Sequence, residues 1–201
     1  MHRMFNKFFN KLNSLMFIKK NDFVTFFEVM YLKLIGVEIG SDCQFRGWSS
    51  FLIVENSTIK INKNCRFNSD TISNRIGINH KCMISTLQKG AFLEIGSDSG
   101  FSGVSIGCFK KIIIGRNVKV GANVLITDSD WHLDDSRVSE PKPIFIGDNV
   151  WLGYGVVVMK GVTIGDNTII GINSVVVKDI PPNVVAAGNP CIVIKAINSQ
   201  F

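Results

Sequence analysis

The chain has 201 residues, of which 46% are hydrophobic and 19% are charged, and its formal net charge at pH 7 is +6. The length and apolar content predict a single domain with a sizeable core. Its five scattered cysteines form no C-x-x-C pair, which argues against a disulfide framework or a zinc site and fits a reducing compartment.

Residues 1–36 form the first predicted element, a helical segment unlike the rest of the chain. Apolar side chains recur at helical spacing across residues 5–16 and basic residues lie mostly off that stripe, which predicts a basic amphipathic helix. A second, apolar helix is expected from Asp22, as its N-cap, to Ile35, with Gly36 ending it. We expect the segment to cap the fold, to contact an anionic membrane surface, or both. No apolar run reaches the roughly 18 residues of a spanning helix, and no cleaved signal peptide is recognisable.

From Val37 onward one motif recurs: an aliphatic residue, Gly, any residue, then Asn or Asp. Its copies, one of them with Asn in place of Gly, are Ile39–Asp42, Ile61–Asn64, Ile76–Asn79, Ile95–Asp98, Ile114–Asn117, Val120–Asn123, Ile146–Asn149, Ile164–Asn167 and Ile170–Asn173. Late in the chain the aliphatic positions keep a six-residue phase without slip: Ile146, Leu152, Val158, Ile164, Ile170 and Val176. Such a fixed period identifies a repeat architecture and outranks local propensity. His80, beside the third copy, is expected inside a coil.

A six-residue repeat is explained by a flat side made of one short strand and one sharp corner. One aliphatic side chain per side points inward, while Gly and Asn or Asp accept the positive φ that a corner demands. Three sides close a coil of about 18 residues, and stacked coils pile their inward side chains into columns. We therefore predict an all-β parallel solenoid of about seven coils over residues 37–180, with residues 181–201 as a tail packed on it. An antiparallel sandwich is disfavoured because it would show two-residue alternation between turns.

The repeat stops after Ile126 and resumes at Ile144 or Ile146, out of phase by two. The interruption, residues 127–143, reads TDSDWHLDDSRVSEPKP and is expected to leave one corner as the single excursion from the solenoid. It holds His132 among several acids. An imidazole beside a carboxylate acts as a general base at neutral pH, and the carboxylate fixes its tautomer. His132 is therefore the candidate base, with a solvated surface histidine as the alternative.

A metal site in the same loop is disfavoured. Asp128, Asp130 and Asp134 have alternating spacing, but Leu133 and Ser139 stand where a calcium-binding EF-hand loop needs Gly and Glu. The chain contains no H-E-x-x-H motif. We expect no functional metal.

The residues from Val37 to Ile197, most densely those from Ile112 onward, resemble the hexapeptide-repeat acyltransferases. The stretch PIFIGDNVWLGYGVVVMKGVTIGDNTIIGINSVVVKDIPPNVVAAGNPCIVIKAI is similar to that family's C-terminal signature almost throughout. The chain looks most like the O-acetyltransferases of sugars and bacterial surface polysaccharides, kin to galactoside and maltose acetyltransferases. The resemblance implies a left-handed parallel β-helix with N-terminal helices and one protruding catalytic loop. It also implies a homotrimer with acetyl-CoA bound in a groove between neighbouring subunits.

The resemblance also implies roles for individual residues. His132 matches the catalytic base, and Asp130 its orienting partner. Ser102, in the segment FSGVSI, and Asp128 are implied as contacts of the acceptor. The implied cofactor-binding residues are Trp151, Gly153, Tyr154, Gly171, Ile172, Lys178 and Lys195. Structural alternatives exist for several of them: a surface aromatic for Trp151, solvated charges for the two lysines and a corner residue for Ser102.

The function implied is acetyl-CoA-dependent O-acetylation of a sugar hydroxyl in a bacterial surface glycan or its precursor, with His132 as the base. The alternatives are N-acetylation of a nucleotide-linked amino sugar and a non-catalytic solenoid that serves as a binding or scaffold protein. The net positive charge alone would suit nucleic acid, but the solenoid shows no aromatic–basic interleaving, so no nucleic-acid partner is expected. We expect a cytoplasmic protein that makes peripheral contact with the inner face of the cell membrane through residues 1–36.

Overall fold

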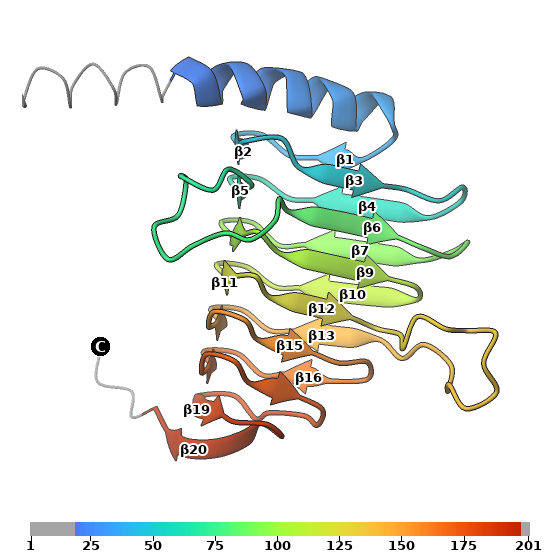
Figure 1. The fold of residues 1–201 in the computed structure, drawn as a ribbon, viewed down its shortest axis with the longest axis vertical. Helices are drawn as coiled ribbons and strands as arrows, with labels where there is room; N and C mark the ends of the chain where they lie inside the picture. Colours follow the sequence, from blue (N-terminus) through green and yellow to red (C-terminus); the bar gives the residue numbers. More distant parts are fainter. Residues whose placement is uncertain (1–18, 198–201) are drawn as a thin grey trace, which may run out of the picture.

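The computed structural model describes residues 19–197, which form a three-sided β-solenoid capped by one helix. The helix covers residues 19–34 and lies across one end of the stacked coils (Figure 1). Six complete coils follow, each with one strand in each of three sheets, and a partial seventh coil contributes two strands to one sheet. Among the described residues, no helix is long and apolar enough to span a membrane.

The three sheets are built from strands that recur in the same order along the chain. Sheet A contains β1 (Glu38–Ile39), β4 (Thr58–Ile61), β7 (Phe92–Ile95), β10 (Lys111–Ile114), β13 (Ile144–Ile146) and β16 (Thr163–Ile164). Sheet B contains β2 (Gln44–Arg46), β5 (Arg66–Asn68), β8 (Gly100–Ser102), β11 (Lys119–Ala122), β14 (Trp151–Leu152), β17 (Ile169–Ile170), β19 (Val184–Ala187) and β20 (Ile192–Ala196). Sheet C contains β3 (Ser50–Leu52), β6 (Met83–Thr86), β9 (Ser105–Cys108), β12 (Leu125–Thr127), β15 (Val157–Val158) and β18 (Val175–Val176).

The predicted inward columns are confirmed. All six aliphatic residues of the unbroken phase, from Ile146 to Val176, are buried in the core. They stack in parallel register, for example Ile146 on Ile164 and Leu152 on Ile170. Toward the N-terminal helix, the sheet B column that contains Leu152 and Ile170 continues as three stacked phenyl rings. They are Phe45, Phe67 and Phe101, with adjacent ring centroids 5.0 and 5.1 Å apart. Because no single coil buries its own column, stability comes from stacking many coils.

The corners follow the prediction for Asn and Asp but not for Gly. Asn117, Asn149 and Asn167 have φ values of 54–58° and donate side-chain hydrogen bonds along the stack at 2.9–3.0 Å. The motif glycines before them have ordinary negative φ. A Cβ at Gly115 would lie 2.6 Å from the carbonyl carbon of Gly147 in the next coil. Gly is therefore required there by close backbone approach rather than by a left-handed conformation.

The N-terminal helix packs one face on the first coil. Val24 and Leu32 are buried beneath it, and Thr25 Oγ1 accepts a hydrogen bond from Phe45 N–H at 2.9 Å. The predicted C-terminal end at Gly36 is confirmed, since Gly36 has a φ of 88°. The predicted start at Asp22 is wrong, because residues 19–21 are already helical. The amphipathic helix predicted within residues 1–18 lies outside the described residues.

A second excursion, residues 69–82, corrects the prediction of a single loop. It joins β5 to β6 and lies on the opposite side of the solenoid from the loop of residues 127–143 in Figure 1. The motif at Ile76 belongs to this loop and not to a coil, and the Ile76 side chain is 61% exposed. His80 likewise lies in the loop. Although this motif has the spacing of a corner, hydrogen bonds with Asn123 and Ser102 hold it and its neighbours in a loop.

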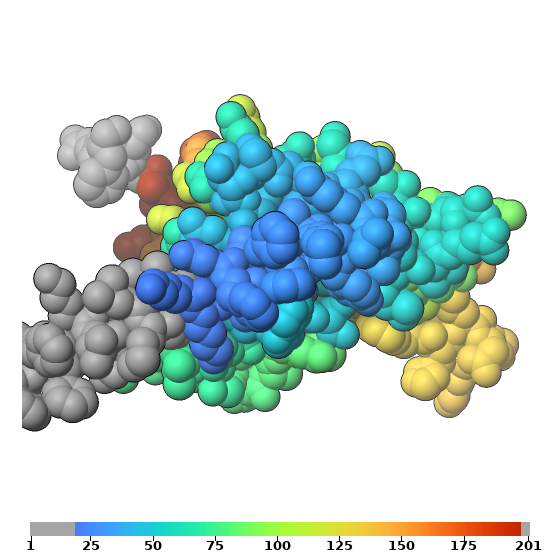
Figure 2. All heavy atoms as spheres, turned by 90° about the horizontal axis from the view of Figure 1, so that it is seen from above, coloured from blue at the N-terminus to red at the C-terminus, as the bar shows by residue number. Residues whose placement is uncertain are grey.

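The two ends of the solenoid are covered differently. Viewed from above, the helix lies over the upper coil (Figure 2). At the other end the predicted tail extends the solenoid, because β19 pairs in parallel with β17. The chain then turns back, and β20 pairs antiparallel to β19 with an irregular register. Sheet B thus ends in a reversed strand.

Candidate active site

The loop of residues 127–143 is anchored at its root by a buried carboxylate. It leaves the corner between sheets C and A, from the end of β12 to the start of β13. Asp128 is fully buried, and its oxygens accept hydrogen bonds from Phe109, Lys110 and Lys111 N–H at 2.7–2.8 Å. Burial, together with the negative charge of Asp128, raises the pKa of the Cys108 thiol. Asp128 was expected to contact the acceptor, but it holds the neighbouring corner and presents no atom to solvent.

Trp131 packs back on the solenoid one residue before His132. Its Nε1–H donates a hydrogen bond to Thr127 Oγ1 at 3.0 Å, and its backbone N–H donates one to Ser129 Oγ at 3.1 Å. The indole lies over Gly107 of sheet C, where an added Cβ would come within 2.6 Å of the ring. Trp131 has a φ of 73°, which is unusual for a bulky residue and costs roughly 1–3 kcal/mol. The surrounding contacts therefore fix a strained backbone next to the candidate base.

Lys160 ties the two arms of the loop together. Its Nζ donates to Asp130 Oδ2 at 2.5 Å and to the Ser139 carbonyl at 2.7 Å, and its side chain is only 12% exposed. Lys160 follows β15 at the corner that the loop leaves. The loop is thus fastened before His132 by the Asp130 ion pair and the Trp131 contact, and after it by the Ser139 carbonyl.

His132 itself is exposed, and its backbone N–H donates to the Asp130 carbonyl at 3.0 Å. Within residues 19–197, no hydrogen bond reaches its imidazole. The predicted pairing of the Asp130 carboxylate with that imidazole is not present in the described chain, because the carboxylate binds Lys160. The ring is consequently free to meet a substrate hydroxyl.

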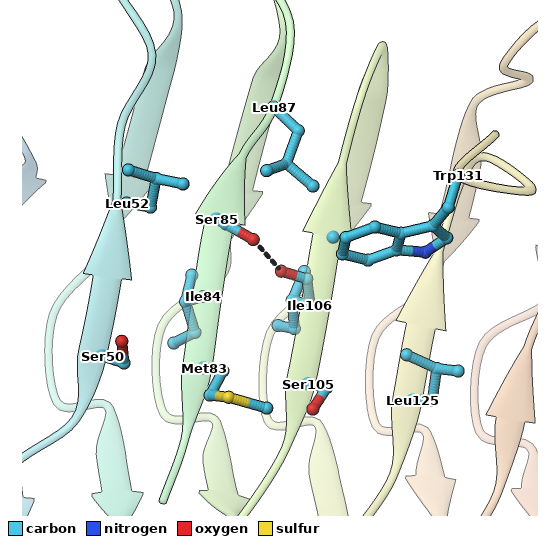
Figure 3. A pocket seen from close by; sticks show the side chains of 11 residues that line it. Ser50, Leu52, Met83, Ile84, Ser85, Leu87, Ser105, Ile106, Leu125 and Trp131 are labelled. Carbon is cyan, nitrogen blue, oxygen red and sulfur yellow. Dashed lines mark hydrogen bonds between the residues drawn. The ribbon is translucent and has the colours of Figure 1, made fainter. Parts of the chain in front are cut away.

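An apolar groove of about 470 Å³ lies beside the loop on the outer face of sheet C. Figure 3 shows the Trp131 ring reaching across the sheet toward the strand of Ile106, with Leu87 and Leu125 on either side. Leu52 and Met83 continue the groove toward the helical cap and are well exposed. The groove thus forms an open apolar face next to His132.

Most of the predicted cofactor residues come together at another corner, between sheets B and C. Gly153 and Tyr154 follow β14 there, and Gly171 and Ile172 follow β17 directly below. A Cβ at Gly153 would lie 2.8 Å from Ile172 N and 3.0 Å from the carbonyl carbon of Gly171. Glycine is therefore required at this corner because the backbones of successive coils approach closely.

Of the three remaining predicted cofactor residues, two lie in one outward column of sheet B and the third lies elsewhere. Trp151 is 51% exposed beside the glycine column, and Lys195 lies in the same column near the C-terminal end. Lys178 instead follows β18, at the corner between sheets C and A from which the His132 loop leaves. On one chain, His132 and Lys178 are therefore separated from the glycine column by sheet C.

Ser102 lies at the upper end of sheet B, nearly buried. Its Oγ accepts hydrogen bonds from the amides of Asn68 at 3.1 Å and Asn74 at 3.0 Å. Asn74 belongs to the loop of residues 69–82, so this loop closes over the serine that was predicted to contact an acceptor. Ser102 is thereby part of a polar cluster and not a simple corner residue.

Sequence reasoning missed two residues of this site, Lys160 and Gly107. Lys160 stands where a repeat turns a corner, and nothing in its immediate neighbours marks it. Gly107 is preceded by Ile106, which gives the weak signal of an aliphatic–Gly pair without the following Asn or Asp. In the part of the chain that the structure describes, no group of three or more His, Cys, Asp or Glu side chains is placed to hold a metal ion.

Comparisons with known sequences point to one family. The family model described as bacterial transferase hexapeptide (six repeats) matches residues 143–178, and that described as hexapeptide repeat of succinyl-transferase matches residues 112–128. The galactoside O-acetyltransferase of Escherichia coli is 50% identical over 93 residues, which are 44% of this chain and 46% of that protein. A putative acetyltransferase of Saccharomyces cerevisiae is 47% identical over 94 residues, 45% of this chain and 48% of that protein. The chain thus spans about half the length of the curated relatives it matches.

A comparison of structures agrees. A solved structure of galactoside acetyltransferase in complex with coenzyme A is 31% identical and covers 81% of this chain and 66% of that chain, with a TM-score of 0.50. The similarity therefore extends beyond the C-terminal coils that the sequence matches.

Proposed function

This chain belongs to the hexapeptide-repeat acyltransferase family, and on that premise we propose that it is an acetyl-CoA-dependent O-acetyltransferase acting on a sugar hydroxyl. One observation carries the proposal: an imidazole with no hydrogen-bond partner among the described residues stands on a loop that is fastened before it by Asp130 and Trp131 and after it by Ser139. A base held this way is positioned before the substrate arrives, which removes part of the entropy cost of the reaction. We also propose that the coils of the solenoid wind in the left-handed sense.

The chemistry follows from a general base and two substrates held together. His132 takes the proton of the sugar hydroxyl while that oxygen attacks the thioester carbonyl of acetyl-CoA. A backbone N–H of the solenoid wall stabilises the oxyanion that develops. The intermediate then collapses to the acetyl ester and the CoA thiolate, and the imidazolium returns its proton to the sulfur. No covalent intermediate with the protein is needed.

A homotrimer is part of the proposal because the two halves of the site lie at different corners of one chain. A neighbouring subunit would bring its glycine column to the His132 loop, with acetyl-CoA between the two. Mixing His132→Ala chains with Trp151→Ala chains tests this, since some interfaces of the mixed oligomer keep both residues. We expect each variant alone to be nearly inactive and the mixture to recover part of the activity. A mixture as inactive as its components would contradict a shared site.

The function is tested by removing the base. With acetyl-CoA and a panel of sugars, release of the CoA thiol by His132→Ala should fall by about 10²- to 10⁴-fold, while CoA affinity and oligomeric state stay the same. Arg137→Gln, on the same loop and exposed, is the control and should remain active. Full turnover by His132→Ala would refute the assignment. Faster transfer to amino sugars would favour the N-acetyltransferase alternative, and a wild type without turnover would favour a binding protein.

Contact with an anionic membrane is proposed through the helix of residues 19–34. Its outer face carries exposed apolar side chains: Phe23, Phe26, Phe27, Met30, Tyr31 and Leu34. Leu34 is 77% exposed and Phe26 is 65% exposed, and lysines at positions 19, 20 and 33 flank them. Such a face suits the boundary between lipid headgroups and acyl chains. The double variant Phe26→Ser, Leu34→Ser should release the protein from phosphatidylglycerol vesicles, and unchanged binding would remove this part of the proposal.

A position at the cytoplasmic face of the membrane, where a glycan precursor is built, belongs to the same proposal.

A further inference from the structure

The outer face of sheet B carries a continuous column of side chains along the solenoid. Read upward from Lys195, the register continues through Trp151 and Lys119 to Gly100 and then Arg66. Two of the proposed cofactor residues, Trp151 and Lys195, occupy the lower part of this column. The next positions above them, Lys119, Gly100 and Arg66, are not part of the proposed cofactor site.

A gap opens in the column at Gly100. Nothing lies within 4 Å of a Cβ built there, and the strands on its two sides carry Arg66 and Lys119. Parallel strands are roughly 4.8 Å apart, so the two cationic residues stand about 10 Å apart across open space. The gap has the width of a single sugar ring between two positive charges.

Arg66 borders this gap, and Arg46 lies on the next strand beyond it, beside Asn68. Arg66 donates from Nε to Gln44 Oε1 at 3.3 Å, and among residues 19–197 no carboxylate forms a salt bridge with Arg66 or Arg46. Arg46 is diagonal to Arg66 on the neighbouring strand. Burial, followed by the charge of Arg66, lowers the pKa of the Arg46 guanidinium. Two like charges held together in this way are stabilised when an anion binds between them.

A polar cluster closes one side of the gap. Asn68 and Ser102 lie in the column next to Arg66 and Gly100, and Asn74 covers them from the loop of residues 69–82. Asn68 Oδ1 is buried and has no hydrogen-bond partner among the described residues. A buried acceptor without a partner costs roughly 1–3 kcal/mol, and a sugar hydroxyl would satisfy it.

We propose that this bay, bounded by Arg46, Arg66, Gly100 and the Asn68–Ser102 cluster, binds an acceptor sugar that carries a carboxylate or phosphate group. The inference rests on the proposed function and names its substrate class: an acidic sugar. The guanidinium groups bind the anionic group, and the Asn68 carbonyl accepts a hydrogen bond from a ring hydroxyl. The CoA phosphates are not the occupant, because their proposed lysines lie at the opposite end of the solenoid.

Binding of matched sugar pairs to the full chain tests the bay without requiring turnover. The pairs are methyl glucuronide against methyl glucoside, N-acetylneuraminic acid against N-acetylmannosamine, and glucose 6-phosphate against glucose, each titrated by saturation-transfer NMR. We expect at least one acidic sugar to bind about tenfold or more tightly than its neutral partner. That preference should weaken with added salt. The carboxylate and phosphate arms show which anionic group the bay prefers.

Variants locate the binding. Arg66→Gln and Arg46→Gln should each remove the preference for the acidic sugar by about tenfold and leave binding of the neutral partner unchanged. Lys63→Gln, an exposed residue on the corner before Arg66, removes the same charge from the same coil and should have no effect. The inference is overturned if no acidic sugar binds better than its neutral partner, or if both arginine variants keep the preference. CoA binding is measured on the same samples: its absence would count against the proposed function, whereas CoA binding without acidic preference would count against the bay alone.

Discussion

The two loops that leave the solenoid are held in opposite ways. The loop of residues 127–143 is fixed from inside, by the buried Asp128 carboxylate, by the seat of Trp131 and by Lys160. The loop of residues 69–82 is fixed mostly from outside, by side-chain amides and by the Lys20–Asp70 ion pair at 2.9 Å to the helical cap. Surface ion pairs and single amide bonds stabilise much less than a buried, fully satisfied carboxylate.

The difference matches the task proposed for each loop. A base must keep its position to within a fraction of an ångström, so the loop that carries it is rigidly anchored. A loop that closes over an acceptor gains from a smaller cost of opening. Changing one anchor at a time tests this contrast.

The largest effect is expected from Asp128→Ala. It leaves three backbone N–H groups without their acceptor, and we expect the free energy of unfolding to fall by about 3–5 kcal/mol. Chemical denaturation measures it. Asp128→Asn, which keeps one oxygen, should lose less, and the exposed Asp134→Ala should lose almost nothing. Equal stability of Asp128→Ala and Asp134→Ala would mean that the carboxylate does not anchor the loop.

A large, pH-dependent change in the free energy of unfolding is expected from Glu28→Gln, on the buried face of the capping helix. Burial raises the pKa of Glu28 to about 7, against the opposing effects of the Ser49 N–H bond and the charge of Lys81. The folded protein therefore holds a proton that the unfolded chain loses from its ordinary value of 4.5 upward. The stabilising contribution is complete below pH 4.5 and is lost as pH rises to about 7, by up to about 3 kcal/mol.

Glu28→Gln should remove that fall, so that the variant becomes relatively more stable as pH rises from 5 to 8. Denaturation midpoints across this range measure the difference. Glu38→Gln, exposed on β1, is the matched control. If the denaturation midpoints of Glu28→Gln and wild type changed with pH in the same way, a protonated Glu28 would not be what stabilises the helical cap.

Gly107→Ala displaces Trp131 without touching His132. The three atoms nearest to the added methyl all belong to the indole. We expect kcat to fall by about 10- to 100-fold with little change in the KM for acetyl-CoA, because the base is misplaced while the cofactor site is intact. Thr127→Ser keeps the acceptor of the Trp131 N–H and should retain most of the activity. An unchanged kcat in Gly107→Ala would show that the seat of Trp131 does not position the base.

The smallest effect is expected from Asn123→Gly, which loosens only the loop of residues 69–82. Asn123 accepts from Asn79 N–H at 2.9 Å and donates to the Gly77 carbonyl at 3.2 Å. Glycine keeps the positive φ of this corner, so only the clamp is lost. Cleavage by trypsin within the loop should become about fivefold faster, in line with roughly 1 kcal/mol. Asn149→Gly, a corner of the same backbone type without a loop contact, should be cleaved like wild type.

The regular part of the fold was predictable from the sequence because one short period repeats without slip. The six positions from Ile146 to Val176 are all buried as expected, and Gly153 packs directly on Gly171 of the next coil. The loop of residues 127–143 was also found, since an interruption is easy to see against a regular background. These features depend on local spacing, which the sequence displays directly.

The exceptions arise where long-range contacts decide. The motif at Ile76 has the spacing of a corner, but Asn123 and Ser102 hold its backbone and neighbours in a loop. Asp128 stands beside the candidate base in sequence, yet its carboxylate points into the solenoid because three N–H groups of the coil above need an acceptor. Spacing along the chain does not reveal which partners a polar side chain finds across coils.

The reversed strand β20 changes the edge that the last coil offers to another molecule. The last rung of a parallel coil is a template on which another molecule's first rung would add, giving a growing fibre. Here the final edge of sheet B runs in the wrong direction and with a broken register, and the opposite end is roofed by a helix. Head-to-tail addition is thereby disfavoured at the end of sheet B and at the end of the solenoid that the helix covers.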